Sequence, residues 1–272
     1  MSEIEQIVSA VRSSKKYRTV CAETVRRLAA GELQRAANPK QAVKATKRRL
    51  HQVYGAFEAG IDYDEAYARL EEAYRSNAPG RIREVCRQVL ASHSSTRERL
   101  PLLDEFYPAI WQVTGPPHSI LDTGCGLNPL ALPWMGLPHL ARYIALDIDG
   151  ARIDFLDHFL ALAGLPPLAR CQDLLVEPPA DEADVALLLK MSPSLERQQE
   201  GATLHLVGQL NAPWVVVSYA VKSLGGREKG MVEQYGRQFR QWAGERGWPV
   251  HELAFPGELV FVVDRRHLFP GP

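Results

Sequence analysis

An acidic residue and two glycines follow an apolar run in the sequence SILDTGCGLNPLAL and could form part of a ligand site. Gly124 and Gly126 have no side chains, so a ligand can approach the backbone closely there. Dinucleotide-binding loops carry a third glycine near a pyrophosphate, but here Asn128 and Pro129 follow instead. Asp122 would be a poor neighbour for a phosphate, so this segment favours a ligand with a cationic or hydroxyl-rich part.

Two further acids occur at similar points along the chain. Asp147 ends the apolar run RYIALD and could accept hydrogen bonds from ribose hydroxyls. Asp173, in the sequence RCQDLL, could bind an adenine amino group while Leu174 contacts the ring. Acids at three successive strand ends favour a nucleoside without phosphates, and S-adenosylmethionine is the obvious candidate. Taken singly, Asp147 and Asp173 could also be ordinary solvated strand ends.

Strands must position these acids, and the chain beyond the TGPP segment at 114–117 has the pattern of an α/β fold. Apolar runs alternate with helical or loop segments, which predicts a mostly parallel, doubly wound, Rossmann-like sheet. The runs lie at 119–121, 142–148, 184–189, 214–219 and 258–263. The segments VHELAFP and ELVFVV are separated by a Pro-Gly turn and predict an antiparallel hairpin at the end of the sheet.

The first 113 residues have helical periodicity instead, and we expect a separate helical domain over 1–113 before an α/β domain over 114–272. One helix should end at Gly31. Ser95 and Glu98 have the spacing of a capping box at another helix start. The segment 39–57 carries an apolar stripe and, on another side, a basic stripe.

Charge is distributed unevenly, although the whole chain has a formal net charge of zero. Residues 1–52 contain 12 Lys and Arg against 4 Asp and Glu, a net charge of +8 that the remaining residues must balance. Such asymmetry suggests a docking surface for a polyanion, although a solvated helical face would have the same composition. The basic residues that we expect to contact a polyanion, such as the phosphates of an RNA, are Lys15, Lys16, Arg18, Lys40, Lys44, Lys47 and Arg48.

Several classes of protein do not fit the sequence. The four cysteines form no CxxC pair or Cys/His cluster, which argues against a metal site and against a disulfide framework. The first residues include early acids and no long apolar core, so we expect no signal peptide. No uninterrupted apolar segment is long enough to span a membrane. We therefore expect a cytoplasmic protein.

The whole chain resembles a known family through several specific motifs. These motifs are SSKKYR, ETVRRL, PKQAVKATKRRLH, HSSTRERL, LDTGCGLNPLAL and SLGGREKGM. With the order of a helical part before a Rossmann-like part, they are similar to the aminoglycoside-resistance 16S rRNA methyltransferases. The resemblance implies methylation of N7 of guanine 1405 in the decoding site of the 30S subunit, and resistance to kanamycin- and gentamicin-type drugs. It also implies a class I methyltransferase domain preceded by a helical domain that docks on rRNA.

The resemblance implies a set of cofactor-binding residues. They are Phe57, His93, Ser94, Ser95, Arg99, Gly124, Asp147, Asp173, Leu174, Leu189 and Gln198. Arg99 would bind the methionine carboxylate, which suits a guanidinium, although a single arginine is more often a surface residue. Phe57 could equally pack in the core. At position 124 some family members carry Ala, and we expect either small residue to allow close approach of the cofactor.

The reaction would require positioning more than acid-base chemistry. The N7 lone pair of guanine is nucleophilic without deprotonation, so no general base is needed and alignment dominates. Lys190, after the fourth predicted strand, and Arg227, in SLGGREKGM, are our candidates for holding the target nucleotide; otherwise they would be a solvated strand end and a surface loop.

Two other functions remain open at this point. A small-molecule N- or O-methyltransferase with a helical lid would explain the acids but not the basic stripe. An RNA-binding module with an inactive methyltransferase fold would not need the acids. For the rRNA methyltransferase we expect a monomer.

Overall fold

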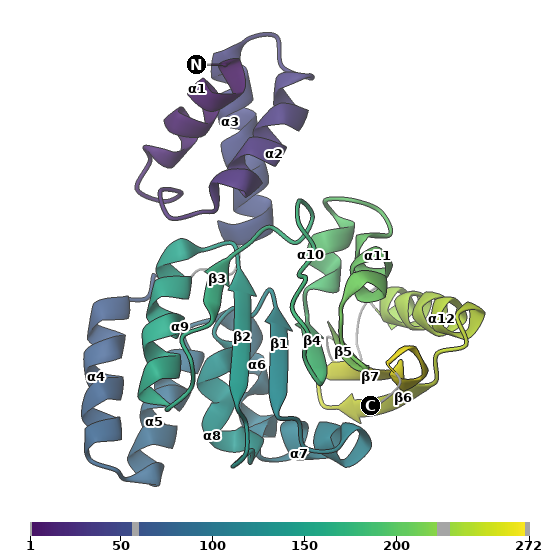
Figure 1. Ribbon diagram of the computed structural model, residues 1–272. Coiled ribbons are helices and arrows are strands. Elements are labelled where there is room, and N and C mark those ends of the chain that lie inside the picture. The colour runs from purple at the N-terminus through teal and green to yellow at the C-terminus, as the bar shows by residue number, and fades with distance from the viewer. Residues whose placement is uncertain (1, 56–59, 222–228, 270–272) are drawn as a thin grey trace.

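The computed structural model describes residues 2–55, 60–221 and 229–269, and a seven-stranded sheet lies at its centre (Figure 1). The strands are β1 (Ser119–Thr123), β2 (Arg142–Asp147), β3 (Ala169–Cys171), β4 (Val185–Leu189), β5 (Trp214–Ala220), β6 (Val250–Phe255) and β7 (Glu258–Asp264). Their order across the sheet is β3-β2-β1-β4-β5-β7-β6. Strands β1 to β5 are parallel, and β7 is antiparallel to β5 and β6. The predicted doubly wound α/β class is confirmed.

Alternate residues of the central strands face helical layers on opposite sides of the sheet. Ile120 packs in one hydrophobic cluster and Leu121 in the other. The first layer contains α4 (Tyr63–Arg75), α5 (Pro79–Leu90), α7 (Leu103–Thr114), α8 (Leu132–Met135) and α9 (Gly150–Leu162). The second contains α10 (Ser192–Glu196), α11 (Ala202–Gln209) and α12 (Lys229–Glu245). Because both faces are buried, these strands are continuous apolar runs, which made them visible in the sequence.

The last two strands form the predicted antiparallel hairpin. The turn between them contains Gly257, whose φ of 80° lies in the left-handed region that glycine adopts readily. Since β7 is antiparallel to β5, its first residue, Glu258, pairs with Ala220 at the end of β5. The hairpin thereby brings an acidic side chain from late in the chain to the carboxyl edge of the parallel strands.

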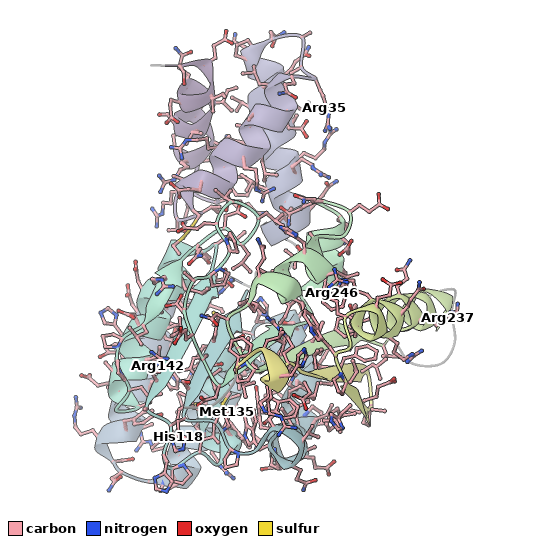
Figure 2. The ribbon with its side chains drawn as sticks, turned by 45° about the vertical axis from the view of Figure 1, so that its right-hand side comes forward. Arg35, His118, Met135, Arg142, Arg237 and Arg246 are labelled. Carbon is pink, nitrogen blue, oxygen red and sulfur yellow. A yellow bond between two sulfur atoms is a disulfide. The ribbon has the colours of Figure 1, made fainter. Side chains whose placement is uncertain are left out.

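Helices α1 (Glu3–Arg12), α2 (Ala22–Leu33) and α3 (Pro39–Leu50) form a three-helix unit at the carboxyl ends of the parallel strands (Figure 1). Its buried residues, among them Ile7, Val25 and Leu50, form their own hydrophobic cluster. Figure 2 shows Arg35 on this unit and His118 at the opposite end of the molecule. Helices α4, α5 and α7 instead share a cluster with the sheet. The division of the chain at residue 114 stays a prediction.

Two predicted helix ends are wrong. Gly31 does not end α2, which continues to Leu33, because Gly31 keeps a negative φ and stays in the helix. Helix α6 (Ser94–Arg99) begins one residue before Ser95, with His93 at the N-cap. The Ser95 hydroxyl lies 2.9 Å from His93 Nδ1 and does not cap the helix. Short helical turns complete the fold: η1 (His51–Gly55), η2 (Leu100–Leu102), η3 (Asn128–Ala131) and η4 (Arg266–Leu268).

A disulfide joins Cys21, at the start of α2, to Cys171, at the end of β3. The cysteine spacing argued against a disulfide framework, and this single bond was not expected from it. The two residues are 150 positions apart, and the fold alone brings their Cα atoms to 6.0 Å. The other two cysteines, Cys86 and Cys125, are buried free thiols, and burial raises the pKa of Cys86 to about 12.

Within the described ranges, no helix is both long and apolar enough to cross a membrane. In the same ranges, no three His, Cys, Asp or Glu side chains gather in a way that could hold a metal ion.

Candidate active site

A pocket lies where the carboxyl ends of β1, β2 and β4 meet α2, α6 and α10. Nine of the predicted cofactor contacts line it: His93, Ser95, Arg99, Gly124, Asp147, Asp173, Leu174, Leu189 and Gln198. Lys190 lines it as well, whereas Ser94 does not. Phe57 and Arg227 lie outside the described residues. The fold thus brings together residues that lie far apart in the sequence.

The glycine turn after β1 forms one wall of the pocket. Gly124 and Gly126 have φ values of 65° and 53°. Residues that carry a Cβ adopt such left-handed angles only at a cost in conformational free energy. A Cβ at Gly124 would also lie 2.5 Å from the Met191 sulfur. Alanine at position 124 would therefore strain the backbone and require Met191 to move, while close approach of a cofactor with either residue stays a prediction.

Asp147 at the end of β2 is held by three donors. Its Oδ1 accepts from Arg152 Nη1 at 3.0 Å and from the Asp149 N–H at 3.1 Å, and its Oδ2 accepts from the Gly126 N–H at 2.9 Å. A carboxylate has about four acceptor positions. About one position is left for a further donor, and binding of ribose by Asp147 stays a prediction.

Asp173 follows β3 and contacts the three-helix unit. Its Oδ1 accepts from the Leu175 N–H at 2.9 Å. Its Oδ2 accepts from Arg27 Nε at 3.0 Å and Arg27 Nη2 at 2.8 Å, and Nη2 also donates to Gln198 Oε1 at 2.8 Å. Two predicted cofactor contacts, Asp173 and Gln198, are therefore joined by an arginine that the sequence analysis did not select.

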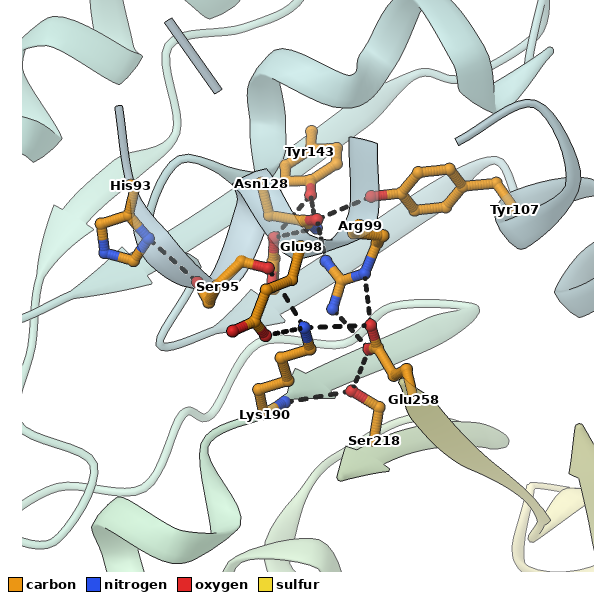
Figure 3. Close-up of polar contacts among 11 residues, drawn as sticks. His93, Ser95, Glu98, Arg99, Tyr107, Asn128, Tyr143, Lys190, Ser218 and Glu258 are labelled. Carbon is orange, nitrogen blue, oxygen red and sulfur yellow. Dashed lines mark hydrogen bonds and ion pairs between the residues drawn. The ribbon is translucent and has the colours of Figure 1, made fainter. Parts of the chain in front are cut away.

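At the other end of the pocket, Arg99 forms a buried ion pair with Glu258 (Figure 3). Arg99 Nη2 and Nε donate to the two carboxylate oxygens at 2.6 and 3.1 Å, and Nη1 donates to Asn128 Oδ1 at 3.0 Å. The Arg99 and Glu258 side chains are only 3% and 1% exposed, so Arg99 is not a surface arginine. A guanidinium has more N–H groups than these three bonds use, so donors remain for a ligand carboxylate.

Opposing effects set the protonation of Glu258. Burial by itself would raise the pKa of this carboxyl. The charges of Arg99 and Lys190 and the hydrogen bonds from Arg99 and Ser218 outweigh burial and hold the pKa below its ordinary value. Glu258 is therefore a stable carboxylate that compensates two buried cations.

Lys190 is also fixed by this cluster (Figure 3). Its backbone has a left-handed φ of 57°, and its N–H donates to the backbone oxygen and the hydroxyl of Ser218. Its Nζ donates to the Ser95 carbonyl at 3.2 Å and to Glu98 at 2.9 Å, and lies 3.4 Å from Glu258. The side chain is 7% exposed. Lys190 is thus an ordered pocket residue, and the alternative of a solvated strand end is wrong.

Asp122 does not face the pocket, contrary to the expectation from the sequence. Its Oδ2 accepts from Asn128 Nδ2 at 2.8 Å and from the Tyr143 hydroxyl at 2.6 Å. Burial raises the pKa of Asp122 to about 6, although these two hydrogen bonds oppose the shift. Asp122 instead supports Asn128, which in turn accepts from Arg99.

His93 contributes a neutral ring to the pocket. The residue is 6% exposed, and burial, reinforced by the charge of Arg152, lowers the pKa of the imidazole to about 4. At physiological pH the ring is therefore uncharged. Such a ring suits contact with an apolar or neutral part of a ligand.

The seven predicted RNA-binding residues all lie on the three-helix unit. They are Lys15, Lys16, Arg18, Lys40, Lys44, Lys47 and Arg48, and all but Lys47 are exposed. The segment between α1 and α2 contacts the end of α3, since Lys16 Nζ lies 3.0 Å from His51 Nδ1 and the Tyr17 hydroxyl donates to the Lys47 carbonyl. Lys16 and its neighbours therefore lie beside the carboxyl end of α3.

Some pocket residues had little signal in the sequence. Arg27 belongs to a basic helical segment and looked like part of its solvated surface. Arg152 lies within α9, and Glu258 looked like an ordinary strand start. Asn128 stood in the glycine-containing segment, and Arg27 in ETVRRL, one of the motifs that carry the family resemblance, although neither was selected for a role.

The fold and the pocket define a class I S-adenosylmethionine-dependent methyltransferase. The strand order, the glycine turn after β1 and the acids after β2 and β3 are the features that place it there. The chain belongs to the ribosomal RNA methyltransferase (FmrO) family, whose model matches residues 12–262.

Similar proteins carry more specific names. A 16S rRNA (guanine(1405)-N(7))-methyltransferase of Micromonospora echinospora is 39% identical over 265 residues, covering 96% of this chain and 97% of the relative. One of Frankia casuarinae is 40% identical over 267 residues, covering 96% and 94%. The crystal structure of the 16S rRNA methyltransferase RmtF in complex with S-adenosyl-L-homocysteine has a TM-score of 0.83 and 34% identity, covering 97% and 99% of the two chains.

Proposed function

We propose that this protein transfers a methyl group from S-adenosyl-L-methionine to N7 of guanine 1405 of 16S rRNA. The observation that carries the proposal is the position of the basic three-helix unit at the pocket that holds the predicted cofactor contacts. An RNA held by that unit would lie beside the methyl donor. Family membership and relatives of this name over 96% of the chain support the same reaction.

The pocket fits the chemistry of S-adenosylmethionine, which supplies an electrophilic methyl group when bound. Asp147 retains an acceptor for a ribose hydroxyl, and Arg99 retains donors for the methionine carboxylate. Leu174 can pack against the purine ring. Thr24, on α2, lines the same pocket with a buried hydroxyl that has no hydrogen-bond partner among the described residues. Orphaned buried hydroxyls of this kind are expected where a ligand completes the site.

The protein's part in the reaction is alignment. Guanine N7 has a free lone pair, so the chain needs to hold the base in line with the methyl group rather than remove a proton. The base has to leave its stack to reach the pocket. Lys190, fixed beside the pocket by Glu98 and Glu258, and Arg227 are proposed to hold the target nucleotide.

The proposed substrate is the rRNA within the 30S subunit. This substrate would place the protein in the cytoplasm. We also propose that the protein acts as a monomer. The basic surface made by the seven Lys and Arg residues would contact phosphates, so binding should weaken steeply with salt. Lys44→Glu and Arg48→Glu should weaken subunit binding at least tenfold while leaving affinity for S-adenosylhomocysteine unchanged, as filter binding and calorimetry would show. Unchanged subunit affinity would reduce the basic stripe to a solvated face.

Mapping the methylated nucleotide tests the reaction itself. Purified 30S subunits incubated with the protein and labelled S-adenosylmethionine should acquire one methyl at N7 of guanine 1405. A methyl on another nucleotide would contradict the proposal. Transfer only to small molecules would instead favour a small-molecule methyltransferase with a helical lid.

Expression in a susceptible bacterium tests the consequence. An N7 methyl adds bulk and positive charge where a polycationic drug would bind, so resistance to kanamycin- and gentamicin-type compounds is expected. Lys190→Ala and Arg227→Ala should reduce resistance more than they reduce cofactor or subunit binding. If both variants kept full resistance, these two residues would be removed from the mechanism.

A further inference from the structure

The start of α2 is anchored to the end of β2. Cys21 N–H donates to the Ile148 carbonyl at 2.8 Å, and the Gly150 N–H donates to the Thr19 carbonyl at 2.8 Å. The Thr19 hydroxyl donates to Asp149 Oδ1 at 3.0 Å. These contacts hold the start of α2 against the loop after β2. They therefore fix the positions of the side chains on the first two turns of the helix.

Two of those side chains enter the cofactor pocket. Thr24 and Arg27 lie three residues apart, on one face of the helix, and both line the pocket. Thr24 is fully buried, and its hydroxyl has no hydrogen-bond partner among the described residues. Arg27 reaches Asp173 and Gln198, with its own side chain 25% exposed and that of Asp173 3% exposed. The three-helix unit thus supplies polar groups to the pocket in addition to its basic outer surface.

Arg27 determines how the Asp173 carboxylate is presented. Two N–H groups of Arg27 fill Oδ2, so the remaining acceptor position of Asp173 is on Oδ1, which already receives the Leu175 N–H. Gln198 is oriented in the same way, because its Nε2 donates to the Ser194 carbonyl while its Oε1 accepts from Arg27. Both groups are therefore held in one orientation by a residue of another structural unit.

We propose that Arg27 is a positioning residue of the cofactor site, which presents Asp173 Oδ1 to the exocyclic amino group of the purine. This inference rests on the proposed cofactor function. The three-helix unit then has two roles, because the same helices that carry the RNA-binding surface also complete the purine end of the pocket. Without Arg27 a nearly buried carboxylate loses its counter-charge, and its orientation is no longer defined.

The test compares two ligands on the full-length protein by calorimetry. S-adenosylhomocysteine has the purine amino group, whereas S-inosylhomocysteine has in its place a carbonyl oxygen, which accepts hydrogen bonds and cannot donate one to Asp173. The wild-type protein should prefer the amino ligand by about tenfold or more, the value of a charge-assisted hydrogen bond. Arg27→Ala should weaken S-adenosylhomocysteine binding about tenfold and reduce the preference to about twofold or less.

Arg26→Ala is the matched control. Arg26 is the neighbouring residue of α2, but it pairs with Glu5 and Glu23 at the surface. This variant should keep both the affinity and the preference of the wild type. Arg27→Lys retains the charge but not the two-pronged contact, so its preference should be intermediate; it replaces Arg27→Ala if that variant does not fold.

Three outcomes are decisive. Wild-type affinity and preference in Arg27→Ala would overturn the inference, and so would an equal loss of both ligands, which would indicate packing alone. If the wild-type protein bound neither ligand, the proposed cofactor function would fail instead.

Discussion

The two ends of the pocket are both built around an arginine and a carboxylate, but in different surroundings. Arg99 and Glu258 both belong to the part of the chain that packs with the sheet, and both side chains are almost completely buried. Arg27 and Asp173 come from different hydrophobic units, and the Arg27 side chain is one quarter exposed. The Arg99–Glu258 pair is therefore buried within one structural unit, whereas the Arg27–Asp173 pair connects two units.

The difference predicts different roles. A buried pair costs little while intact, but removing one partner leaves a charge without compensation, so that end should control stability. In the second pair only Arg27 is partly exposed, so Arg27 can turn toward water when the Asp173 carboxylate is removed. Removing that carboxylate should therefore affect ligand affinity more than stability. Four changes test this contrast.

The largest effect is expected for Glu258→Ala. This change leaves the buried cations Arg99 and Lys190 without their shared carboxylate, and it should reduce the free energy of unfolding by about 3–5 kcal/mol in urea titrations. Glu252→Ala is the control, because it removes the partner of Arg240 in an exposed pair. This change should alter the free energy of unfolding by less than about 1 kcal/mol. Similar losses in both variants would remove the contrast between buried and exposed pairs.

Acid should protonate the buried imidazole of His93, which lies near Asp147 and Arg152. Its pKa is about 4 in the folded protein and about 6.5 in the unfolded chain, so folding favours the neutral ring. The stability from this group is complete above pH 6.5 and is lost as the pH falls toward 4, by about 2 kcal/mol between pH 7.5 and pH 5. His93→Gln should remove that part of the pH dependence of urea unfolding. His205→Gln changes an exposed histidine, and this variant should keep the pH dependence of the wild type.

Gly124→Ala changes the glycine turn after β1, which forms the pocket wall between the two arginine–carboxylate pairs. A left-handed φ of 65° with a side chain costs about 1–2 kcal/mol, and the Met191 side chain would have to move. We expect a loss of that size in unfolding free energy, with weaker cofactor binding. Gly136→Ala provides the control, since it has a φ of 63° and open space around the added Cβ. Stability losses should be similar in the two variants, and only Gly124→Ala should affect the cofactor.

The smallest change in stability is expected for Asp173→Asn. Arg27 can turn toward water, so the free energy of unfolding should fall by less than about 1 kcal/mol. Affinity for S-adenosylhomocysteine should nevertheless fall about tenfold, because an amide presents a poorer acceptor to the purine amino group. A stability loss as large as that of Glu258→Ala would show that the Arg27–Asp173 pair also behaves as a fully buried ion pair.

Much of the fold could be read from local patterns. The apolar runs at β1, β2, β4 and β5 were visible because strands buried on both faces need no polar alternation. Gly31 and Ser95 misled the helix boundaries because propensity is only a weak prior at a single position. The acids after β2 and β3 were found because parallel strands direct their carboxyl ends to one edge.

The amino-acid sequence by itself determined the α/β class, the family resemblance and the nine predicted contacts that line the pocket, because those signals are local or carried by short motifs. Only the tertiary structure decided which charges meet. It turned Asp122 inward, brought Glu258 to Arg99 across 159 positions and joined Arg27 to Asp173 across 146. Whether an arginine is a surface residue or part of a site depends on what packs against it, and that is fixed by contacts between segments far apart in the chain.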